Sequence, residues 1–455
     1  MRLWQDLKEG MLKQPGQTIC EGRAKMTFEE VAVYAEIFSK KLARESCCAI
    51  LCGSEMMTSI ALLSCFAAGV TAVPLSVRYG KSHCHKIMDM IDPTAVITDV
   101  DGELQVLHIA DAAYQKPPVH PALIMCTSGT TGRPKGAMLT ENNILTNVRD
   151  IGAYFRIGQE DTILIARPLY HCAVLTGEFL TSLLKGTAIR FYSEQFNPKV
   201  LLDLIEEYKI TVFCGTPTLL SMMARFARKK ADSTLKTICI SGECMGEETG
   251  KKIAKAFPCA SIYHVYGLTE ACPRVSYLPP CLFNDHVDSV GIPLNGVSLR
   301  IVKPDGSAAA KNEEGVLWVK GDNVMAGYYS DPDQTAKVLC GGWLCTGDIA
   351  VINADGLLKI KGRSDDLIIR AGMNIYPQEI ESALKNDPRV HEVLVYKIDN
   401  PKSGVQIGLK IAGAFTDTGE VKRLCIEALP PFQVPTAIEL LDELPKNGSG
   451  KILRR

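Results

Sequence analysis

The sequence predicts an α/β protein with two domains, a large N-terminal domain with mainly parallel sheets and a small α+β C-terminal domain. Three observations predict this class. Short apolar strands alternate with helices through roughly the first 285 residues. Stretches with hairpin-forming turns follow, and they lead into a last α+β unit of about 90 residues. At 455 residues, the chain is also too long for one ordinary hydrophobic core.

The N-terminal part shows regular alternation. Thr27 and Glu30 have the spacing of a capping box, and the apolar residues after them recur at helical intervals to about residue 45. "CCAILCG" and "TAVPLS" have the composition of short buried strands, with "SIALLSCFAAG" as a packed helix between them. Residues 94–98 and 121–127 form further apolar runs. This strand–helix–strand order predicts a mainly parallel sheet.

The same alternation continues beyond residue 160. The predicted strands are 161–170, 186–192, 210–217, 235–243 and 261–270, and the predicted helices are 175–185 and 199–209. Several of these strands end in turns of small residues. Because ligand sites in open α/β sheets lie at the carboxyl ends of strands, we expect these turns to face one cleft.

From about residue 286 the pattern changes. β-Branched alternation and the turn pairs Asp305-Gly306 and Asp355-Gly356 predict antiparallel hairpins. After "GRSDDLI" a compact α+β unit begins. Its helices are predicted at 376–388 and 419–429, and its strands at 390–398 and 405–415. We therefore divide the chain into domains at residues 1–364 and 365–455.

Bulk composition excludes several function classes. The formal net charge is −1, which gives no global field for nucleic acid or an anionic membrane surface. The N-terminal residues have no apolar run typical of a signal peptide, and no segment is apolar enough to cross a membrane. The 17 cysteines are scattered and odd in number, so we expect reduced thiols in a cytoplasmic protein. We expect a monomer or a homodimer.

The stretch "TSGTTGRPKG" at 127–136 carries the strongest chemical signal. It follows a buried strand, its glycines let the main chain approach a ligand, and its hydroxyls and two cations suit a polyphosphate. An exposed polar turn is the plain alternative, which the density of donors directly after an apolar strand disfavours. The spacing of Gly129, Gly132 and Lys135 excludes the P-loop of NTPases, and the Rossmann fingerprint is absent.

The stretch "TSGTTGRPKGAML" closely resembles the phosphate-binding signature of the adenylate-forming superfamily, which includes acyl-CoA synthetases, aryl acid ligases, peptide-synthetase adenylation domains and luciferases. Further segments resemble other signatures of this superfamily and follow one another in the same order as in the superfamily. They are "YGLTE", "WLCTGD", "GRSDDLIIRAGMNIYPQEIE" and, at the C-terminus, "PKNGSGKILRR". The resemblance implies a distorted β-barrel subdomain and a mobile C-terminal domain. It also implies ATP-dependent activation of a carboxylic acid to acyl-AMP, followed by thioester formation that releases AMP.

The resemblance implies which residues bind the triphosphate. Thr269 would contact the α-phosphate, and Glu270 would hold Mg²⁺, a hard cation that prefers oxygen ligands. Taken alone, "YGLTE" is equally typical of a helix entry with a surface glutamate. The residues that would line the β- and γ-phosphates are Thr127, Ser128, Gly129, Thr130, Thr131 and Lys135.

The resemblance also implies a nucleoside site. Tyr266 would lie against the adenine face, and His264 stands where the family often has Asn, which leaves the adenine hydrogen bond open. Asp348 would bind both ribose hydroxyls, since one carboxylate accepts two hydrogen bonds, and Arg363 would add a ribose and phosphate contact. The residues around the base would be Ser241, Gly242, Glu243, His264, Tyr266 and Gly267.

Three residues from position 365 onward would have roles that depend on movement of the C-terminal domain. By the resemblance, Lys451 enters the cleft during adenylation and stabilises charge between the carboxylate and the α-phosphate. Without the resemblance it would be an ordinary lysine in a glycine-rich tail. Asp365 would be the hinge about which the C-terminal domain swings between the half-reactions. Gly372 would line the channel for a pantetheine arm, where a small residue leaves room.

The acid pocket is predicted to be mostly apolar. Cys172 takes the position of the aspartate that pairs with the substrate ammonium in amino-acid adenylating domains, so an aryl or aliphatic acid fits better. "PLYH" is similar to the acyl- and aryl-CoA ligases and makes His171 a catalytic candidate, with a core histidine beside a strand as the alternative. The candidate lining residues are His171, Cys172, Leu175, Cys214, Gly215, Thr216, Gly267 and Cys272.

The thiol of the second step would be coenzyme A or the phosphopantetheine of a carrier protein, and we favour coenzyme A. The chain is short for the superfamily, which would also fit a stand-alone enzyme that loads a carrier protein. A luciferase-like oxygenase and an inactive binding protein on the same fold are further alternatives. The presence of Glu270, Asp348, Arg363 and Lys451 argues against the inactive protein.

Overall fold

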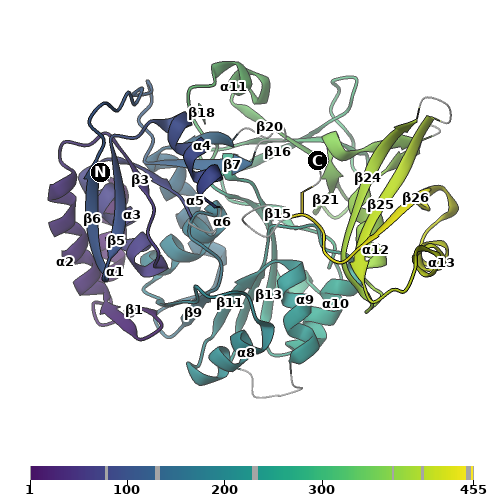
Figure 1. The fold of residues 1–455 in the computed structure, drawn as a ribbon, viewed down its shortest axis with the longest axis horizontal. Coiled ribbons are helices and arrows are strands. Elements are labelled where there is room, and N and C mark those ends of the chain that lie inside the picture. The colour runs from purple at the N-terminus through teal and green to yellow at the C-terminus, as the bar shows by residue number, and fades with distance from the viewer. Residues whose placement is uncertain are drawn as a thin grey trace.

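The computed structural model describes residues 2–76, 80–128, 134–227, 234–370, 373–400, 404–446 and 452–453, without the side chains of Ser128 and Asn400. Two large sheets and their helices form the N-terminal part, and a smaller antiparallel sheet adjoins them (Figure 1). An α+β domain follows at the C-terminal end of the chain. The predicted fold class is confirmed.

The first sheet has seven strands in the order β18-β8-β7-β4-β3-β5-β6. Its parallel centre, β7-β4-β3-β5, consists of the four predicted apolar runs. α2 (Phe28–Ser39) begins at the predicted capping box, and α3 (Glu55–Ala68) and α4 (Lys81–Ile91) follow it in the chain. The strands are β3 (Cys47–Ile50), β4 (Thr71–Pro74), β5 (Ala95–Val100), β6 (Glu103–His108), β7 (Leu123–Ser128), β8 (Pro134–Leu139) and β18 (Gly327–Tyr328).

The second sheet has nine strands in the order β15-β14-β13-β12-β11-β9-β10-β1-β2, parallel from β13 through β1. α8 (Pro198–Glu207), α9 (Pro217–Phe226) and α10 (Glu247–Ala256) bury their apolar faces against one side of it. The strands are β1 (Thr18–Glu21), β2 (Ala24–Thr27), β9 (Thr162–Ile165), β10 (Ala188–Phe191), β11 (Val212–Gly215), β12 (Thr237–Ile240), β13 (Ser261–Gly267), β14 (Arg274–Leu278) and β15 (Ile292–Pro293).

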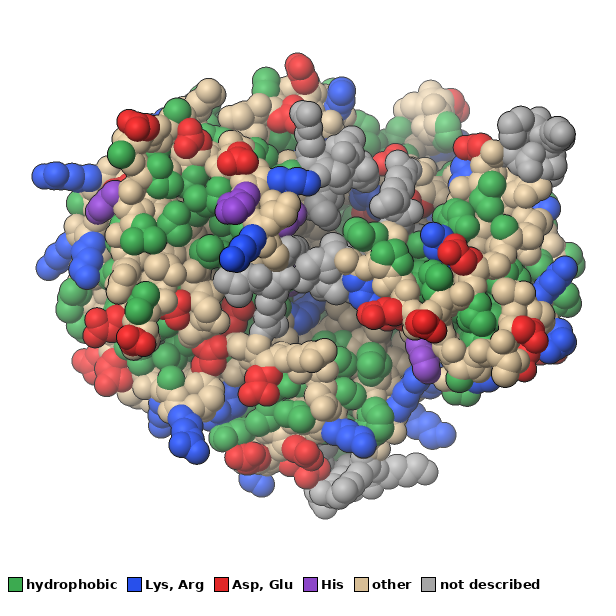
Figure 2. All heavy atoms as spheres, viewed as in Figure 1, with side chains coloured by type: hydrophobic (Ala, Val, Ile, Leu, Met, Phe, Trp, Pro, Cys, Tyr) green, Lys and Arg blue, Asp and Glu red, His purple; other side chains and the backbone are tan. Residues whose placement is uncertain are grey.

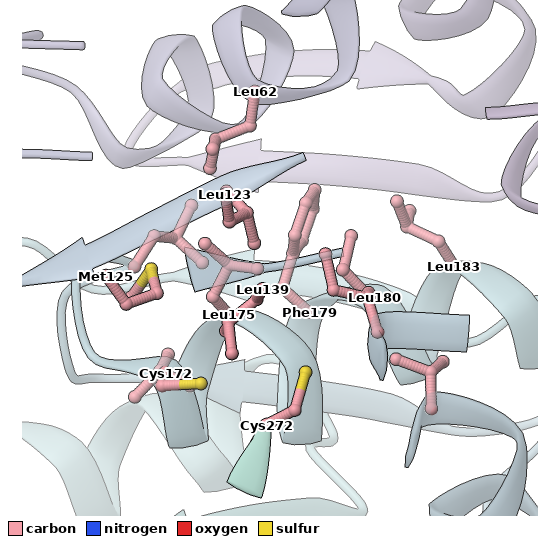
Figure 3. Packing of buried hydrophobic residues seen from close by; sticks show 14 of the residues in the cluster. Leu62, Leu123, Met125, Leu139, Cys172, Leu175, Phe179, Leu180, Leu183 and Cys272 are labelled. Atoms are coloured by element: carbon pink, nitrogen blue, oxygen red, sulfur yellow. The ribbon is translucent and has the colours of Figure 1, made fainter. Parts of the chain in front are cut away.

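A buried helical segment packs against both large sheets, and its side chains meet those of β7, β8 and α3 (Figure 3). The sequence predicts one regular helix over 175–185. The structure instead has α6 (Cys172–Val174), a π-helical turn (Leu175–Leu180) and α7 (Thr181–Lys185). The Thr181 hydroxyl donates to the main-chain oxygen of Thr176, five residues back, at 2.9 Å. π-Turns inside helices are frequent at functional sites.

Helices α1 (Arg2–Leu12) and α5 (Glu141–Tyr154) pack beside α7. The predicted hairpins of the antiparallel subdomain are confirmed in β16/β17 and β20/β21. Gly306 and Gly356 end the two Asp-Gly pairs with φ of 84° and 83°, a region that favours glycine. The elements are β16 (Ser298–Val302), β17 (Gly315–Lys320), α11 (Pro332–Val338), β19 (Leu339–Cys340), β20 (Trp343–Ile352) and β21 (Leu358–Arg363).

The C-terminal domain has its own hydrophobic core. A 3-10 turn at Ser364–Asp366 connects β21 to this domain, so the predicted boundary lies between two regular elements. Figure 2 shows a hollow between this domain, at the right of the view, and the large domain. Its elements are β22 (Ile368–Arg370), β23 (Met373–Ile375), α12 (Pro377–Leu384), β24 (Val390–Asn400), β25 (Gly404–Gly413), α13 (Thr418–Ala428) and β26 (Ala437–Leu441).

Within the described ranges, none of the helices is both long and apolar enough to span a lipid bilayer.

Candidate active site

Asp348 lies at the centre of a hydrogen-bonded group that joins three strands. The Tyr266 hydroxyl donates to Oδ2 of Asp348, and Nη1 of Arg363 lies 3.1 Å from Oδ1. Thr346 and Asp348 are on β20, Arg363 is on β21 and Tyr266 is on β13. The Thr346 hydroxyl accepts from the Asp348 N–H at 3.0 Å, which fixes the backbone beside the carboxylate. Three predicted nucleoside contacts therefore converge.

Burial and the carboxylate of Asp348 together set the protonation of Tyr266. Burial raises the pKa of Tyr266 well above its usual value, and the neighbouring carboxylate of Asp348 adds to the shift. Tyr266 thus stays a neutral hydrogen-bond donor. Asp348 is 8% exposed, so its carboxylate is largely desolvated and depends on Tyr266 and Arg363 for partners.

A second group contains the predicted phosphate and magnesium residues. The Tyr328 hydroxyl donates to Oε1 of Glu270 at 2.8 Å, and Nζ of Lys135 lies 5.4 Å from the centre of the Tyr328 ring. Tyr328 reaches this place because β18 pairs with β8, two residues beyond Lys135. Burial raises the pKa of Tyr328, and Glu270 raises it further, so the phenol keeps its proton. The sequence analysis missed Tyr328.

Gly267 connects the two groups. It lies on β13 between Tyr266 and the 3-10 turn Thr269–Ala271, which carries Glu270. A Cβ at residue 267 would lie 2.1 Å from the main-chain oxygen of Pro273 and 3.1 Å from Cα of Arg274. No side chain fits there, so glycine allows the chain to turn directly from the Asp348 group to the Glu270 group.

The segment Ser241, Gly242 and Glu243 follows β12, one strand away from β13. Gly242 has φ of +92°, a conformation that favours glycine. The Glu243 carboxylate accepts from the Thr218 hydroxyl at 2.6 Å, which ties this turn to the start of α9. The predicted adenine-side segment therefore lies at the same carboxyl edge of the sheet as Tyr266.

His264 is buried rather than open to a ligand, since it is only 2% exposed. Its Nδ1 has no hydrogen-bond partner in the part of the chain that the structure describes. Burial lowers the pKa of His264 to about 4. The imidazole is therefore neutral at physiological pH.

This burial makes the stability of the protein depend on pH. The unfolded chain takes up the His264 proton below about pH 6.5, whereas the folded chain takes it up only near pH 4, so stability falls as the pH is lowered through this window. We expect a loss of about 2 kcal/mol between pH 7 and pH 5 from this residue alone. His264→Asn should remove that loss in urea titrations at the two pH values.

The exposed His391 provides a matched control. His391→Asn should keep the wild-type difference between the two pH values. An unchanged difference in His264→Asn would contradict the assigned pKa.

Most of the residues predicted to line the acid pocket are buried. Cys172 and Cys272 are 5% and 0% exposed, and the Thr176 hydroxyl contacts the main-chain oxygens of both, at 2.9 and 3.2 Å. His171 precedes α6, and its ring packs against Tyr170 with centroids 4.2 Å apart. Cys214 and Gly215 end β11 and Thr216 caps α9. The pocket residues thus come from elements around the second sheet.

Several predicted residues cannot be placed. Gly372 and Lys451 lie outside the described residues, as do Gly129, Thr130 and Thr131. Thr127 and Ser128 end β7, and the described backbone pairs Thr127 with Lys135 on β8. The two described ends of the predicted phosphate-binding segment therefore lie on paired strands, β7 and β8.

The chain matches two family descriptions that together span both domains. "AMP-binding enzyme" matches residues 7–329, and "AMP-binding enzyme C-terminal domain" matches residues 379–451. A feruloyl-CoA synthase from Amycolatopsis sp. is 33% identical over 419 residues, 86% of this chain and 84% of that protein. A 2-succinylbenzoate–CoA ligase from Geobacillus kaustophilus is 31% identical over 468 residues, 96% and 93% of the two chains.

The fold also matches solved structures. The o-succinylbenzoate CoA synthetase of Bacillus subtilis with its acyl-adenylate intermediate gives a TM-score of 0.86 at 26% identity, over 99% of this chain and 96% of that one. The same enzyme with ATP and magnesium gives 0.85 at 25% identity, over 99% and 98%. A double mutant of it with a product analogue, OSB-NCoA, gives 0.71 at 26% identity, over 99% and 97%.

These matches confirm the predictions of an AMP-forming acid–thiol ligase that uses ATP, Mg²⁺ and coenzyme A. A carboxylic acid and coenzyme A are its substrates. The predicted phosphate-binding and adenine-side motifs lie in the first matched region, and Lys451 is the last residue of the second. This chain belongs to the family of AMP-binding enzymes.

Proposed function

We propose that this enzyme converts an aryl or aliphatic carboxylic acid, not an α-amino acid, to its coenzyme A thioester through an acyl-AMP intermediate. The observation that carries the proposal is the convergence of the Asp348 group and the Glu270 group on the two sides of Gly267. The first group suits a ribose and the second suits a metal-bound phosphate. Together they suit the two ends of a nucleoside triphosphate.

In the first half-reaction, a carboxylate oxygen of the acid bonds to the α-phosphorus of ATP. The bond from that phosphorus to the bridging oxygen breaks, and pyrophosphate leaves. An anion meets a polyanion in this step, so positive groups and hydrogen-bond donors must stabilise the transition state. We assign this work to Thr269 at the α-phosphate, Lys135 at the outer phosphates and Lys451 between the carboxylate and the α-phosphate.

Glu270 fits a magnesium site. Mg²⁺ is usually held by one or two carboxylates together with substrate phosphates, and Glu270 carries a carboxylate whose Oε1 is oriented by Tyr328. Elsewhere in the described ranges, no group of three His, Cys, Asp or Glu side chains offers an all-protein metal site. Bound Mg²⁺ would neutralise phosphate charge. Tyr328 would fix the carboxylate for it.

In the second half-reaction, the thiol sulfur bonds to the acyl carbon, the acyl–phosphate bond breaks and AMP leaves. We propose that the C-terminal domain turns about Asp365 between the two steps and that Gly372 then lines the path of the pantetheine arm. The structure of this chain matches that of the adenylate-bound synthetase with a TM-score of 0.86. Its match to the form with the product analogue is lower, with a TM-score of 0.71. This difference supports an adenylation arrangement here.

The proposed class of acid, one without an α-ammonium group, is based on the residues that line the predicted pocket. Cys172 has no charge with which to hold a substrate ammonium, and its neighbours Leu175 and Cys272 are buried and apolar. The names of the relatives, feruloyl-CoA synthase and 2-succinylbenzoate–CoA ligase, support an aryl acid and coenzyme A rather than a carrier protein. We place the enzyme in the cytoplasm as a monomer or homodimer. Its 17 cysteines are scattered and odd in number, which favours a reducing compartment.

A panel assay tests the proposal. Purified enzyme with ATP and Mg²⁺ is offered aryl acids, fatty acids and α-amino acids, and pyrophosphate release is measured with and without coenzyme A. Aryl or fatty acids should release pyrophosphate and yield acyl-CoA and AMP, whereas amino acids should stay at the no-acid control. Preference for an amino acid would contradict the acid class, and acylation of a carrier protein instead of coenzyme A would contradict the thiol.

A further inference from the structure

Two buried charged side chains, Glu178 and Arg274, lie near the partly buried Arg167, beside predicted residues of the acid pocket. Glu178 lies on the π-helical turn and is 1% exposed, and Arg274 begins β14 and is 3% exposed. Arg167 follows β9, and its Nη2 forms an ion pair with Oε1 of Glu178 at 2.5 Å. Charged groups are rarely buried without compensating partners, because the desolvation of each group costs several kcal/mol.

Arg274 lies directly beside the predicted pocket. It pairs with Gly267 across β13 and β14, and a Cβ on Gly177 would lie 2.8 Å from its Nη2. The pocket candidate Cys214 and the neighbouring Cys239 are close enough to affect its charge. Its guanidinium is thus enclosed by the π-helical turn and by the strand ends that carry the pocket residues.

Nε of the Arg274 guanidinium is buried without a hydrogen-bond partner among the described residues. Among the described residues it donates no side-chain hydrogen bond and no carboxylate lies within ion-pair distance, although it is almost fully buried. Burial alone lowers the pKa of Arg274, and Tyr154, Cys239, Cys214 and Glu178 together raise it, so the group keeps its positive charge. Buried guanidinium groups normally bond to several acceptors.

Further unpaired atoms lie in the same region. Nε of Arg167, Oε2 of Glu178, Nε of Arg274 and the hydroxyl of Tyr154 all lack hydrogen-bond partners in the described part of the chain. The two arginines bring two positive charges, and Glu178 supplies one negative charge. Among the described residues, positive charge and hydrogen-bond donors therefore outnumber the acceptors in this region.

We propose that Arg274 is a specificity-determining residue that donates hydrogen bonds to an oxygen at the far end of the carboxylic acid, either a hydroxyl or a second carboxylate. This inference depends on the proposed function, since it concerns the same pocket. The ion pair of Arg167 and Glu178 acts as a positioning pair that fixes one wall beside the guanidinium. An acid with a purely hydrocarbon end leaves Arg274 unpaired and is discriminated against.

The turn at Gly177 makes this arrangement possible. Any side chain at residue 177 would collide with Nη2 of Arg274, and the π-helical turn brings Gly177 and Glu178 to face this guanidinium. The π-helical turn therefore leaves room for the guanidinium of Arg274 at the inner wall of the proposed pocket.

The test uses matched acids that differ only at the far end. Cinnamate, 4-hydroxycinnamate and 4-carboxycinnamate form one series, and hexanoate, 6-hydroxyhexanoate and hexanedioate form another. Pyrophosphate release gives kcat/KM for each acid. In at least one series, wild-type enzyme should prefer an acid with a far oxygen over its hydrocarbon partner by about 100-fold. Comparison of the hydroxyl-bearing acid with the dicarboxylic acid in each series identifies which kind of oxygen is bound.

Variants then assign the preference to Arg274. Arg274→Met has a similar length and no donors, and it should reduce the preference to within about threefold, mainly by weakening activity on the oxygen-bearing acid. Arg274→Lys should restore part of the preference for a carboxylate. Arg300→Met, at an exposed arginine of β16, is the matched control and should keep the wild-type preference.

The outcomes separate this inference from the proposed function. If wild-type enzyme activates hydrocarbon acids at least as well as their oxygen-bearing partners, Arg274 has no such role although the ligase function stands. If no acid releases pyrophosphate while AMP binding persists, the proposed function itself fails. An Arg274→Met protein that binds AMP normally and keeps the full preference also contradicts the inference. If that variant does not fold, Arg274→Lys replaces it, and loss of the preference for a hydroxyl in this variant supports the role whereas full retention of every preference contradicts it.

Discussion

Replacing Lys451 with alanine is expected to reduce acyl-AMP formation by about 100- to 1000-fold, the usual effect of removing one preorganised group from the charge-bearing transition state. The lysine is proposed to lie between two anions, the acid carboxylate and the α-phosphate. A neutral methyl group in its place leaves their repulsion uncompensated. Pyrophosphate release at saturating acid and ATP measures the effect.

The second half-reaction provides the internal control. Thioester formation from supplied acyl-AMP should change by less than about threefold in Lys451→Ala, because the charge-stabilising contact belongs only to the first step. Lys397→Ala removes an exposed lysine of the same domain, which pairs with Asp399 at 2.8 Å, and should leave both steps unchanged. Equal loss of both half-reactions in Lys451→Ala would contradict the proposed role.

The large-domain fold was largely predictable because many of its strands are short and apolar, and β3, β4, β11 and β12 are buried on both faces. The runs that became β3, β4, β5 and β7 have few polar residues, and the parallel sheet that they form needs such runs. The turns after Asp305 and Asp355 were also predictable, since glycine follows each aspartate and adopts positive φ. These signals are local, so sequence patterns contain them.

The contacts of the site were less predictable because they join distant residues. The Tyr266 hydroxyl reaches Asp348, 82 residues away, and the Tyr328 hydroxyl reaches Glu270, 58 residues away. The first pair emerged from a resemblance to known motifs. Tyr328 belongs to no such motif in the sequence analysis, and no local pattern shows that the short β18 pairs with β8 beside Lys135.

Arg274 was missed for a different reason. An arginine is usually exposed, and nothing in "CPRVSYL" shows that this one begins a strand whose side chains are buried. The π-helical turn was missed because the apolar pattern of 175–185 fits a regular helix equally well. Both features depend on how Gly177 and Arg274 pack together, which is tertiary information.

Replacing Asp365 with proline is expected to hold the C-terminal domain in its present arrangement. Asp365 lies in the 3-10 turn Ser364–Asp366, between β21 and β22. A proline ring fixes φ of residue 365 near the value of such a turn, so the backbone rotation needed for domain movement becomes costly. The present arrangement resembles that of the adenylate-bound synthetase, so acyl-AMP formation should persist.

Thioester formation should then fall by about 100-fold in Asp365→Pro, if the fixed backbone adds roughly 3 kcal/mol to the movement. Asp365→Ala keeps free rotation and should retain both steps, which separates the loss of the carboxylate from the loss of backbone freedom. Rapid-quench measurements of acyl-AMP and acyl-CoA in one reaction resolve the two steps. Accumulation of acyl-AMP in the proline variant alone would mean that the domain must turn at this residue before the thiol can attack, whereas an unchanged second step would move the hinge elsewhere in the chain.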